Sequence, residues 1–268
     1  MTAPLETAAS PAPRAALVTG AARRLGRAIA IGLAGAGWDV AVHYRASRDE
    51  ALEVVREIEA MGRRCIALAA DLADEAATAE LFDSARAQLG RIDCVVNNAS
   101  RFEFDRPESF SYQALCSHCA PNLAAPLLLG RRLHAGVPEG EQAVMINLLD
   151  QKLENLNPDF FSYTLSKAAL LAATRMMAMA FAPRVRVVGV SPGITLLSGN
   201  QTQSGFEAAH AMAPLGRSSL PQDVVAAVVY LAGARAVTGV NLLVDGGQHL
   251  MPLDRDVMYA TQQPGGSR

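Results

Sequence analysis

The stretch that decides the fold is Thr19-Gly20-Ala21-Ala22-Arg23-Arg24-Leu25-Gly26. It joins an apolar run, Ala15 to Thr19, to an amphipathic stretch that we expect to be helical from Arg24 to Ala34. Gly20 and Gly26 lack side chains, so the backbone at this turn can approach a pyrophosphate closely. The N-terminus of the helix offers unpaired N–H groups to the same anion. The stretch therefore predicts a dinucleotide site directly after the first strand.

The rest of the chain repeats this alternation of strand and helix. Short Val-rich runs predict further strands, and the amphipathic stretches between them predict helices. We expect strands at 39–44, 64–69, 94–97, 142–148, 185–190 and 240–244, and helices at 48–61, 78–89, 113–133, 162–181 and 222–231. The right-handed crossover rule then gives an α/β fold, a single-domain, Rossmann-like doubly wound parallel sheet with helices on both faces.

We divide the chain into three parts. Residues 1–13 are rich in Ala and Pro and predict a disordered N-terminal arm, residues 14–250 predict the Rossmann-fold domain, and residues 251–268 predict a C-terminal tail of mixed polarity. Within the domain, residues 194–214 have few periodic apolar positions and come just after a strand. We therefore expect this segment to be a mobile flap over a substrate cleft.

The composition excludes several classes of function. The chain has 268 residues and a formal net charge of -2, which gives no basic field for nucleic acid or a membrane surface. Charged residues interrupt the apolar stretches well before the roughly 20 residues that a membrane span needs. The first residues also lack the basic region of a signal peptide. We expect a cytoplasmic protein that binds neither nucleic acid nor a membrane.

The four cysteines predict neither a disulfide nor a metal site. Cys65 and Cys94 lie inside apolar runs, where a free cysteine behaves as a small hydrophobe. Cys116-Ser117-His118-Cys119 is the one metal-like cluster in the sequence, and no second cluster completes a four-ligand zinc site. Buried, reduced thiols agree with a cytosolic location.

A second motif, Tyr163-Thr164-Leu165-Ser166-Lys167, carries candidate catalytic groups. Its spacing places Tyr163 and Lys167 one turn apart on the same face of a helix. A nearby ammonium lowers the pKa of a phenol, so we expect Tyr163 to exchange a proton closer to neutral pH than its ordinary value of about 10 allows. Asp150 follows the strand at 142–148, so it is expected at the C-terminal edge of the sheet, facing Tyr163.

Taken together, these motifs resemble the short-chain dehydrogenase/reductase family over essentially residues 15–250. In most of that family a serine occupies the position of Asp150, and a glycine that of Arg24. The combination of Arg24, Ser100, Phe102 and Asp150 is instead similar to the pteridine reductases, a smaller branch. That branch uses the arginine near the substrate and the phosphates, and it stacks a flat pterin against the aromatic ring.

The resemblance also implies a catalytic set, which consists of Asp150, Tyr163, Lys167 and Asn122. Lys167 would hold the nicotinamide ribose, and Asn122 would order a proton-relay water beside it. Asn is a weak helix former, so a buried interaction is the expected reason for Asn122 inside a long helix. The family's usual assembly implies a homotetramer built on the helices at 113–133 and 162–181.

The end of the second strand predicts NADPH as the cofactor. NAD-specific folds place Asp or Glu there, whereas this chain has His43-Tyr44-Arg45-Ala46-Ser47. Arg45, Ser47 and Arg23 can supply positive charge and a hydroxyl to a 2′-phosphate. Asp71 either contacts the adenine or caps the next helix. The full set of expected cofactor-binding residues is Gly20, Arg23, Arg24, Leu25, Gly26, His43, Tyr44, Arg45, Ser47, Asp71, Leu72, Asn98, Ala99, Ser100, Lys167, Pro192 and Gly193.

By the same resemblance, the substrate is a 7,8-dihydropterin, which takes a hydride at C6 and a proton at N5. Oxidised pterins and dihydrofolate are further candidates. A carboxylate donates a hydrogen bond only when protonated, so Asp150 suits a substrate with N–H donors of its own. Burial can raise the pKa of Asp150 until it protonates a ring nitrogen, directly or through water. Phe102 is the expected stacking residue and Phe104 its rival; the other expected substrate contacts are Arg24, Ser100, Asp150 and Tyr163.

Two other functions stay open. A short-chain reductase of another carbonyl compound, such as a 3-oxoacyl thioester, would leave Arg24 and Phe102 unexplained. A catalytically silent protein that senses NADPH would explain the missing serine. It would not explain why the other catalytic residues are all present.

Overall fold

Seven strands form one parallel sheet in the order β3-β2-β1-β4-β5-β6-β7 in the computed structural model, which describes residues 14–197 and 201–260. The strands are β1 (Ala15–Val18), β2 (Asp39–Tyr44), β3 (Cys65–Ala69), β4 (Cys94–Asn97), β5 (Ala143–Leu148), β6 (Val185–Pro192) and β7 (Asn241–Val244). Each expected strand is present within a few residues of its predicted ends. The expected N-terminal arm lies outside the described residues.

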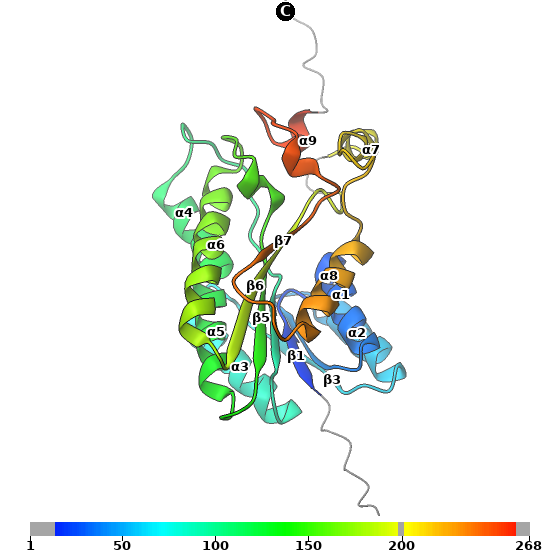
Figure 1. Ribbon diagram of the computed structural model, residues 1–268, viewed down its shortest axis with the longest axis vertical. Helices are drawn as coiled ribbons and strands as arrows, with labels where there is room; N and C mark the ends of the chain where they lie inside the picture. The colour runs from blue at the N-terminus through cyan, green and yellow to red at the C-terminus, as the bar shows by residue number, and fades with distance from the viewer. Residues whose placement is uncertain (1–13, 198–200, 261–268) are drawn as a thin grey trace, which may run out of the picture.

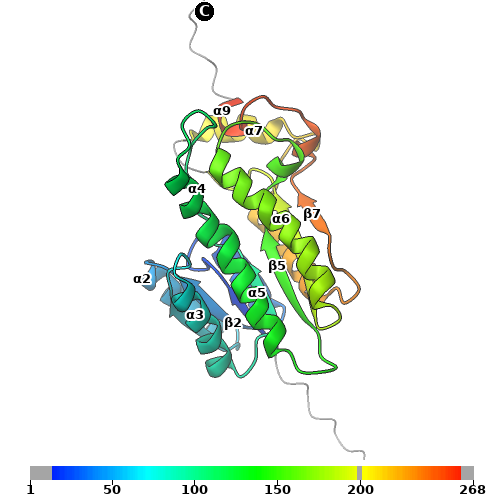
Figure 2. The ribbon, with the colours of Figure 1, turned by 90° about the vertical axis from the view of Figure 1, so that its left-hand side faces the viewer.

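Helices cover both faces of this sheet, which confirms the predicted fold class (Figures 1 and 2). On one face lie α1 (Arg24–Gly35), α2 (Arg48–Ala60) and α8 (Pro221–Gly233). On the other lie α3 (Glu75–Leu89), α5 (Ala125–Gly136) and α6 (Phe161–Phe181). None of the helices in the described part of the chain is both long and apolar enough to cross a bilayer.

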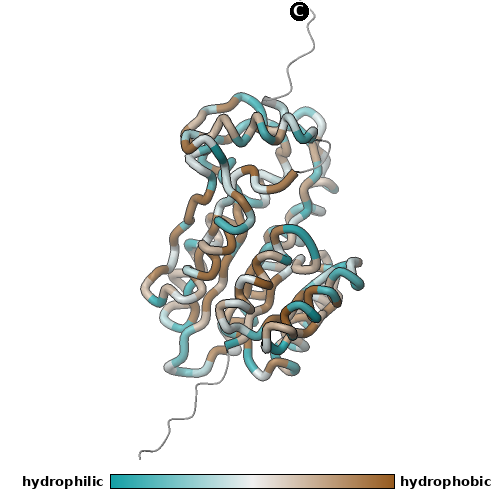
Figure 3. The backbone as a smooth tube through the Cα atoms, turned by 90° about the vertical axis from the view of Figure 1, so that its right-hand side faces the viewer, coloured by the Kyte–Doolittle hydropathy of each residue, from teal (hydrophilic) through white to brown (hydrophobic). Residues whose placement is uncertain are grey.

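The alternation of side chains along the strands divides the core into two layers. Ala16 and Val18 of β1 pack toward α1 and α8, whereas Leu17 packs toward α3 and α5. Both faces are covered, so the strands are apolar throughout, as expected for a parallel sheet. The helices instead alternate between brown and teal along the tube in Figure 3, because each buries only one face.

The long helix expected at 113–133 is divided by a π-helical turn, η1 (Ala120–Ala124), between α4 (Tyr112–Cys119) and α5. Pro121 lies inside this turn and has no backbone N–H to donate to the preceding turn of helix. A wider turn accommodates this loss and places Asn122 in a buried position. The prediction of one uninterrupted α-helix is therefore wrong at this point.

Two smaller helices gather above the carboxyl ends of β5 to β7, α7 (Gln203–Ala211) and α9 (Val257–Ala260) (Figure 1). Helix α7 lies inside the segment predicted as a flap, and the Thr202 hydroxyl caps it by accepting from the Gly205 N–H at 3.1 Å. Residues 198–200 of that segment lie outside the described chain, and its mobility stays a prediction. Of the expected tail, residues 251–260 are described and pack onto the domain.

The sheet order also determines where a ligand can bind. The chain runs outward from β1 to β3 in one direction and from β4 to β7 in the other, so β1 and β4 are neighbours at the switch in winding. In doubly wound sheets, ligands bind in the crevice beyond the carboxyl ends of such strands. The glycine-rich turn follows β1. Asn97 is the last residue of β4 and Asn98 comes directly after it, so the turn and this pair both flank the crevice.

Candidate active site

The glycine-rich turn is tied to the ends of the neighbouring strands by hydrogen bonds. The Thr19 hydroxyl accepts from the backbone N–H groups of Asn98 and Ala99, both at 3.0 Å. The Asn98 side chain donates in return to the carbonyl of Thr19 at 2.9 Å and to that of Gly20 at 3.2 Å. Gly20 itself has a φ of 62°, a conformation that favours glycine. The turn is therefore fixed before any ligand arrives.

His43 fixes the same turn from β2. The Gly20 N–H donates to His43 Nδ1 at 3.0 Å, and His43 Nε2 bonds to the carbonyl of Ala70 at 3.1 Å. Burial lowers the pKa of this imidazole, which keeps it neutral with its proton on Nε2. Both ring nitrogens of His43 are thus used within the protein, and the residue supports the cofactor turn from behind.

Arg24 occupies a strained backbone position. It is one of two residues other than glycine in the described chain with a positive φ, at 53°. This left-handed conformation costs a non-glycine residue about 1–3 kcal/mol and persists where the surroundings require it. The Arg24 guanidinium reaches across the crevice, where Nη2 donates to the carbonyl of Leu197 at 2.8 Å. It therefore joins the cofactor turn to the segment that begins after β6.

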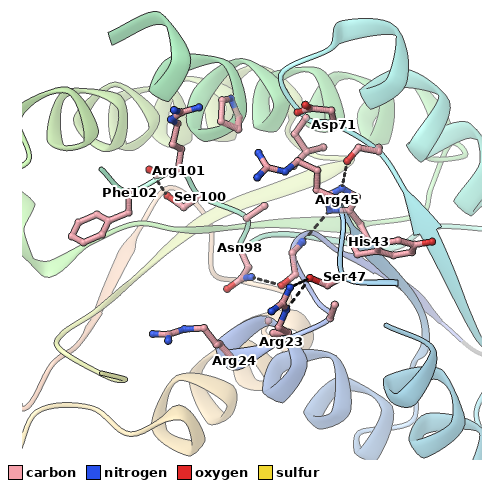
Figure 4. A pocket seen from close by; sticks show the side chains of 18 of the residues that line it. Arg23, Arg24, His43, Arg45, Ser47, Asp71, Asn98, Ser100, Arg101 and Phe102 are labelled. Atoms are coloured by element: carbon pink, nitrogen blue, oxygen red, sulfur yellow. Dashed lines mark hydrogen bonds between the residues drawn. The ribbon is translucent and has the colours of Figure 1, made fainter. Parts of the chain in front are cut away.

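A cleft of about 730 Å³ opens in front of the turn (Figure 4). It brings together most of the residues predicted to bind the cofactor. The predicted residues that line it are Gly20, Arg23, Arg24, Leu25, Gly26, His43, Tyr44, Arg45, Ser47, Asp71, Leu72, Asn98, Ala99, Ser100 and Phe102. Its volume and shape suit an extended dinucleotide better than a compact metabolite.

One end of this cleft carries the predicted anion site. Arg23 Nε donates to the Ser47 hydroxyl at 2.8 Å and lies 3.3 Å from a carboxylate oxygen of Glu50. Arg45 lines the same end (Figure 4). Asp71 also lines the cleft, and its carboxylate accepts from the Ala73 N–H at 2.9 Å. The cap of α3 is Asp74, so the alternative that Asp71 caps this helix is wrong.

Asp150 and Tyr163 meet at the carboxyl end of β5. The Tyr163 hydroxyl donates to Asp150 Oδ2 at 2.7 Å, and the Lys152 N–H donates to Asp150 Oδ1 at 2.8 Å. A 3₁₀ turn, η2 (Gln151–Glu154), presents this N–H. Burial raises the pKa of the Asp150 carboxyl, in the direction that the sequence predicted, although the two hydrogen bonds oppose the rise.

The predicted pKa of Tyr163 is wrong for this structure. Burial raises the phenol pKa well above its ordinary value of 10, and the adjacent Asp150 carboxylate raises it further. Lys167 does not offset this, because its ammonium donates to the carbonyl of Leu148 at 2.6 Å and lies 5.8 Å from the centre of the Tyr163 ring. Burial also lowers the pKa of Lys167 to about 8. The phenol is therefore a hydrogen-bond donor at neutral pH.

Asn122 has a buried set of partners, as expected. Its Oδ1 accepts from the Arg101 N–H at 2.7 Å and from the Ser100 hydroxyl at 3.2 Å, and its Nδ2 donates to the Ser166 hydroxyl at 3.0 Å. These bonds connect the loop after β4 to α6. The relay role of Asn122 stays a prediction.

Four aromatic rings form a cluster beside the Tyr163 phenol. The Phe102 ring stacks on Phe160 with centroids 4.1 Å apart and meets Tyr163 edge-on at 4.7 Å. Phe104 contacts Phe160 at 5.3 Å and Tyr259 at 5.5 Å. Phe102 is 39% exposed although one face is covered, so part of its ring surface is open to a ligand. Phe104 is 49% exposed but does not line the cleft, whereas Phe102 does, so Phe102 is the better placed of the two to contact a ligand there.

The predicted set is divided between two places. Asp150 from the start of η2, Tyr163 and Lys167 from α6 and Asn122 from η1 do not line the cleft itself. Pro192 and Gly193 close β6, and a Cβ on Gly193 would lie 2.2 Å from the Ser218 hydroxyl oxygen. This turn is therefore tightly packed against the segment before α8.

Sequence reasoning missed several residues of the site. Phe160 has a φ of 54° and starts α6, where Ser162 N–H donates to the buried Asp105 carboxylate at 2.9 Å. Lys152 and Asp159 are both buried on the loop between Asp150 and Tyr163, where the Lys152 ammonium donates to the backbone carbonyl of Asp159. No motif in the sequence marks either residue.

In the metal-like cluster Cys116 to Cys119 on α4, the histidine makes structural hydrogen bonds. The buried His118 accepts from the Glu103 N–H at 3.2 Å through Nε2, and its Nδ1 bonds to the carbonyl of Ala114 at 2.8 Å. Within residues 14–197 and 201–260, no group of three or more His, Cys, Asp or Glu side chains could hold a metal ion.

Comparison of the sequence with known proteins finds relatives among the oxidoreductases. Residues 20–249 match the family model described as enoyl-(acyl carrier protein) reductase. An uncharacterized oxidoreductase of Mycobacterium tuberculosis is 35% identical, with 90% of this chain and 94% of that protein covered. The 2-dehydro-3-deoxy-D-gluconate 5-dehydrogenase of Dickeya dadantii is 29% identical, with 87% and 94% covered.

A similar solved structure is FolM alternative dihydrofolate reductase 1 from Brucella canis in complex with NADP. It is 38% identical, covers 91% of this chain and 97% of its own, and has a TM-score of 0.87. The chain belongs to the short-chain dehydrogenase/reductase family.

The close approach at Gly26 gives a testable prediction. A Cβ there would lie 2.1 Å from the Gly20 carbonyl oxygen and 2.5 Å from Asn98 Nδ2, so Gly26→Ala must open the turn. We expect the affinity for NADPH, measured by fluorescence titration, to fall roughly tenfold or more. Gly35→Ala is the matched control, because its Cβ would meet only Met61 at an ordinary 3.5 Å. Equal affinities in both variants would contradict the role of the turn.

Proposed function

We propose that this protein is an NADPH-dependent reductase that converts a 7,8-dihydropterin to the tetrahydropterin. The observation that carries the proposal is the 2.7 Å hydrogen bond from the Tyr163 hydroxyl to the Asp150 carboxylate. A carboxyl group at this position can exchange both a proton and hydrogen bonds with the amino-pyrimidine edge and ring nitrogens of a pterin. A serine hydroxyl suits a simple carbonyl instead.

Three further features support a pterin as the substrate. The exposed part of Phe102 can stack a flat ring, which is worth about 0.5–1.5 kcal/mol beyond burial. Arg24 is retained at a strained backbone position and points across the crevice, where a polar substrate edge would lie. The similar solved structures from Brucella canis and Brucella suis carry the name alternative dihydrofolate reductase 1.

The cleft has the residues that a phosphorylated dinucleotide requires. Gly20 and Gly26 would accept the pyrophosphate at the start of α1, and Arg23, Arg45 and Ser47 would hold the 2′-phosphate. Both phosphate groups would then meet backbone N–H groups or cations. NADP is the ligand in the similar solved structures, and NADPH is the cofactor of this protein. When bound, it supplies the hydride for C6 of the substrate.

Asp150 would supply the proton, and Tyr163 would orient it. Burial raises the pKa of Asp150, which favours the protonated carboxyl group that a general acid needs. Asp150 then donates this proton to N5, directly or through a water, as C6 receives the hydride. Tyr163 keeps its own proton, because its pKa is raised, and its hydrogen bond holds the Asp150 carboxyl in place. Solvent returns the proton consumed in each turnover.

The first test measures oxidation of NADPH by the purified protein in the presence of four substrates in parallel. These are 7,8-dihydrobiopterin, dihydromonapterin, dihydrofolate and an acetoacetyl thioester. Turnover of the dihydropterins supports the proposal and ranks the substituents at C6. Turnover of the thioester alone would assign the protein to the carbonyl reductases, and no turnover with measurable NADPH binding would favour a sensor.

Replacement of the central carboxylate tests the mechanism. We expect Asp150→Ser to lower kcat for dihydropterin about 100-fold or more, the contribution of general acid catalysis, and to leave NADPH affinity nearly unchanged. Tyr163→Phe keeps the ring contacts with Phe102 but removes the bond that orients Asp150, so it should also lose turnover. Normal turnover by Asp150→Ser would refute the role of this carboxyl group.

The pKa of Lys167 predicts opposite pH trends for binding and stability. The folded chain loses the Lys167 proton near pH 8, below the ordinary value of 10.5. NADPH affinity should therefore fall above about pH 8, as the ammonium that would bind the ribose is lost. Between pH 8 and 10.5 the unfolded chain holds more protons, so the contribution of this group to folding stability rises with pH. Lys167→Met should show neither trend in titrations of affinity and of unfolding.

We also propose that the protein is a homotetramer in which the helical stretch from α4 to α5, together with α6, forms the main contacts. Leu165, Met176 and Met179 share one face of α6 and are 41%, 69% and 83% exposed. Light scattering should give four times the chain mass of 28.3 kDa. The double variant Met176→Lys, Met179→Lys should give a smaller particle, whereas a monomeric wild-type protein would refute the proposal.

A further inference from the structure

The C-terminal segment 251–260 lies on the loop that joins Asp150 to Tyr163. It approaches the carboxyl end of the sheet from β7 and ends in α9, beside α7 (Figure 1). The Asn155 side chain donates to the carbonyl of Met251 and accepts from the Leu253 N–H at 3.4 Å. Val257 and Met258 of α9 are buried. The segment is therefore packed on the catalytic loop of its own chain.

A buried carboxylate anchors this contact. Asp159 is fully buried and accepts at Oδ2 from Arg255 Nε at 2.7 Å and from the Asp256 N–H at 2.9 Å. Arg106 Nη1 approaches its other oxygen at 3.3 Å. Burial alone would raise the pKa of Asp159, but the hydrogen bonds from Arg255 and Asp256 outweigh it and lower the pKa. Asp159 is thus an ionised group whose partners come mainly from the C-terminal segment.

Lys152 carries the contact to the catalytic carboxyl group. Its buried ammonium donates to the carbonyl of Asp159 and to Asp256 Oδ2, the latter at 3.1 Å. Its backbone N–H donates to Asp150 Oδ1 at 2.8 Å. A continuous series of bonds thus runs from Asp256 through Lys152 and Asp150 to the Tyr163 hydroxyl.

The aromatic rings give a second route between the same parts. The Tyr259 ring lies 6.1 Å from that of Phe160 and nearly parallel to it, and Phe160 stacks on Phe102. The Arg255 guanidinium lies over the Tyr259 ring, with its central carbon 5.2 Å from the ring centre. The segment therefore touches both the polar and the aromatic walls of the site.

We propose that Arg255 and Asp256 are positioning residues for catalysis, which hold the Asp150–Tyr163 pair in place from the C-terminal segment of the same chain. The reaction they serve is the proposed pterin reduction. Their structural effect on the catalytic loop does not depend on the identity of the substrate. Phe102 is the one residue of these contacts that lines the nucleotide cleft, and Lys152, Asp159, Arg255 and Asp256 do not line it, so cofactor binding should depend little on Arg255 and Asp256.

Asp256 also acts on the charges of the pair. The titratable groups that interact with Asp150 are Tyr163 and Lys167 from α6, Lys152 from η2 and Asp256 from the C-terminal segment. The Asp256 carboxylate raises the pKa of both Asp150 and Tyr163, whereas Lys152 lowers that of Asp150. Asp256→Asn removes the first effect and leaves the Lys152 ammonium without its counter-charge. Both changes lower the pKa of Asp150.

Amide hydrogen exchange of the full-length protein tests the positioning. We expect Arg255→Leu to speed exchange at residues 151–162 roughly tenfold, as for the loss of one charge-assisted hydrogen bond, and to leave residues 19–26 unchanged. Arg91→Leu is the matched control, because Arg91 also pairs an accessible guanidinium with a buried carboxylate, that of Asp93 at the opposite edge of the sheet. Unchanged exchange at 151–162 in Arg255→Leu would overturn the proposal.

The pH profile of kcat/KM for a dihydropterin gives the second readout. Asp256→Asn should move the Asp150 inflection to lower pH with unchanged NADPH affinity, and a profile identical to wild type would overturn the proposal. If Asp256→Asn does not fold, Arg255→Lys is measured by hydrogen exchange instead. This variant keeps the positive charge, so exchange at residues 151–162 should be slower than in Arg255→Leu, and equal rates would overturn the proposal. If the wild-type protein reduces no dihydropterin, the proposed function fails, and the exchange result alone decides this proposal.

Discussion

The constraint on which this structure depends is the common direction of its seven strands. All of their carboxyl ends lie at one edge of the sheet. The turns that follow β1, β2, β4, β5 and β6 therefore come together at that edge. Hydrogen bonds between Thr19 and Asn98 then fix the distance between β1 and β4, where the winding changes direction. The cleft exists because these two strand ends are held together while their helices leave on opposite faces.

The site beside this cleft has to keep charged groups in a buried place. Asp150, Lys152, Asp159 and Lys167 all approach the interior, and each is matched by a hydrogen bond or a charge of opposite sign. Such networks are sensitive, since an unmatched member leaves a buried charge that is costly to retain. The arrangement explains why the region between η2 and α6 is crossed by contacts from distant parts of the chain.

The sequence was sufficient for the features that depend on local chemistry. Runs such as Val40 to Val42 and Val144 to Ile146 can bury both faces only in a central parallel strand, so the sheet followed from them. Most of the cofactor residues lie in turns after these strands, so placing the strands also placed the turns. The spacing of Tyr163 and Lys167 similarly required only one helix.

The features that the sequence did not reveal depend on contacts between distant residues. The π-helical turn at Pro121 packs with α4 against α6, and a proline in a helical pattern does not specify the kind of break. The raised pKa of Tyr163 depends on whether Asp150 or Lys167 lies closer to the hydroxyl, which spacing does not determine. The role of Asp159 requires Arg255, which is 96 positions away in the chain.

The position of the C-terminal segment has a practical consequence for anyone who labels this protein. The described chain begins at the amino end of β1 and ends in α9, so its two ends lie at opposite edges of the sheet (Figure 1). A reporter or affinity tag fused directly after Ala260 would be attached at the carboxyl edge of the sheet, near Arg255 and Asp256. One fused directly before Arg14 would be attached at the far edge, away from Asp150 and Tyr163.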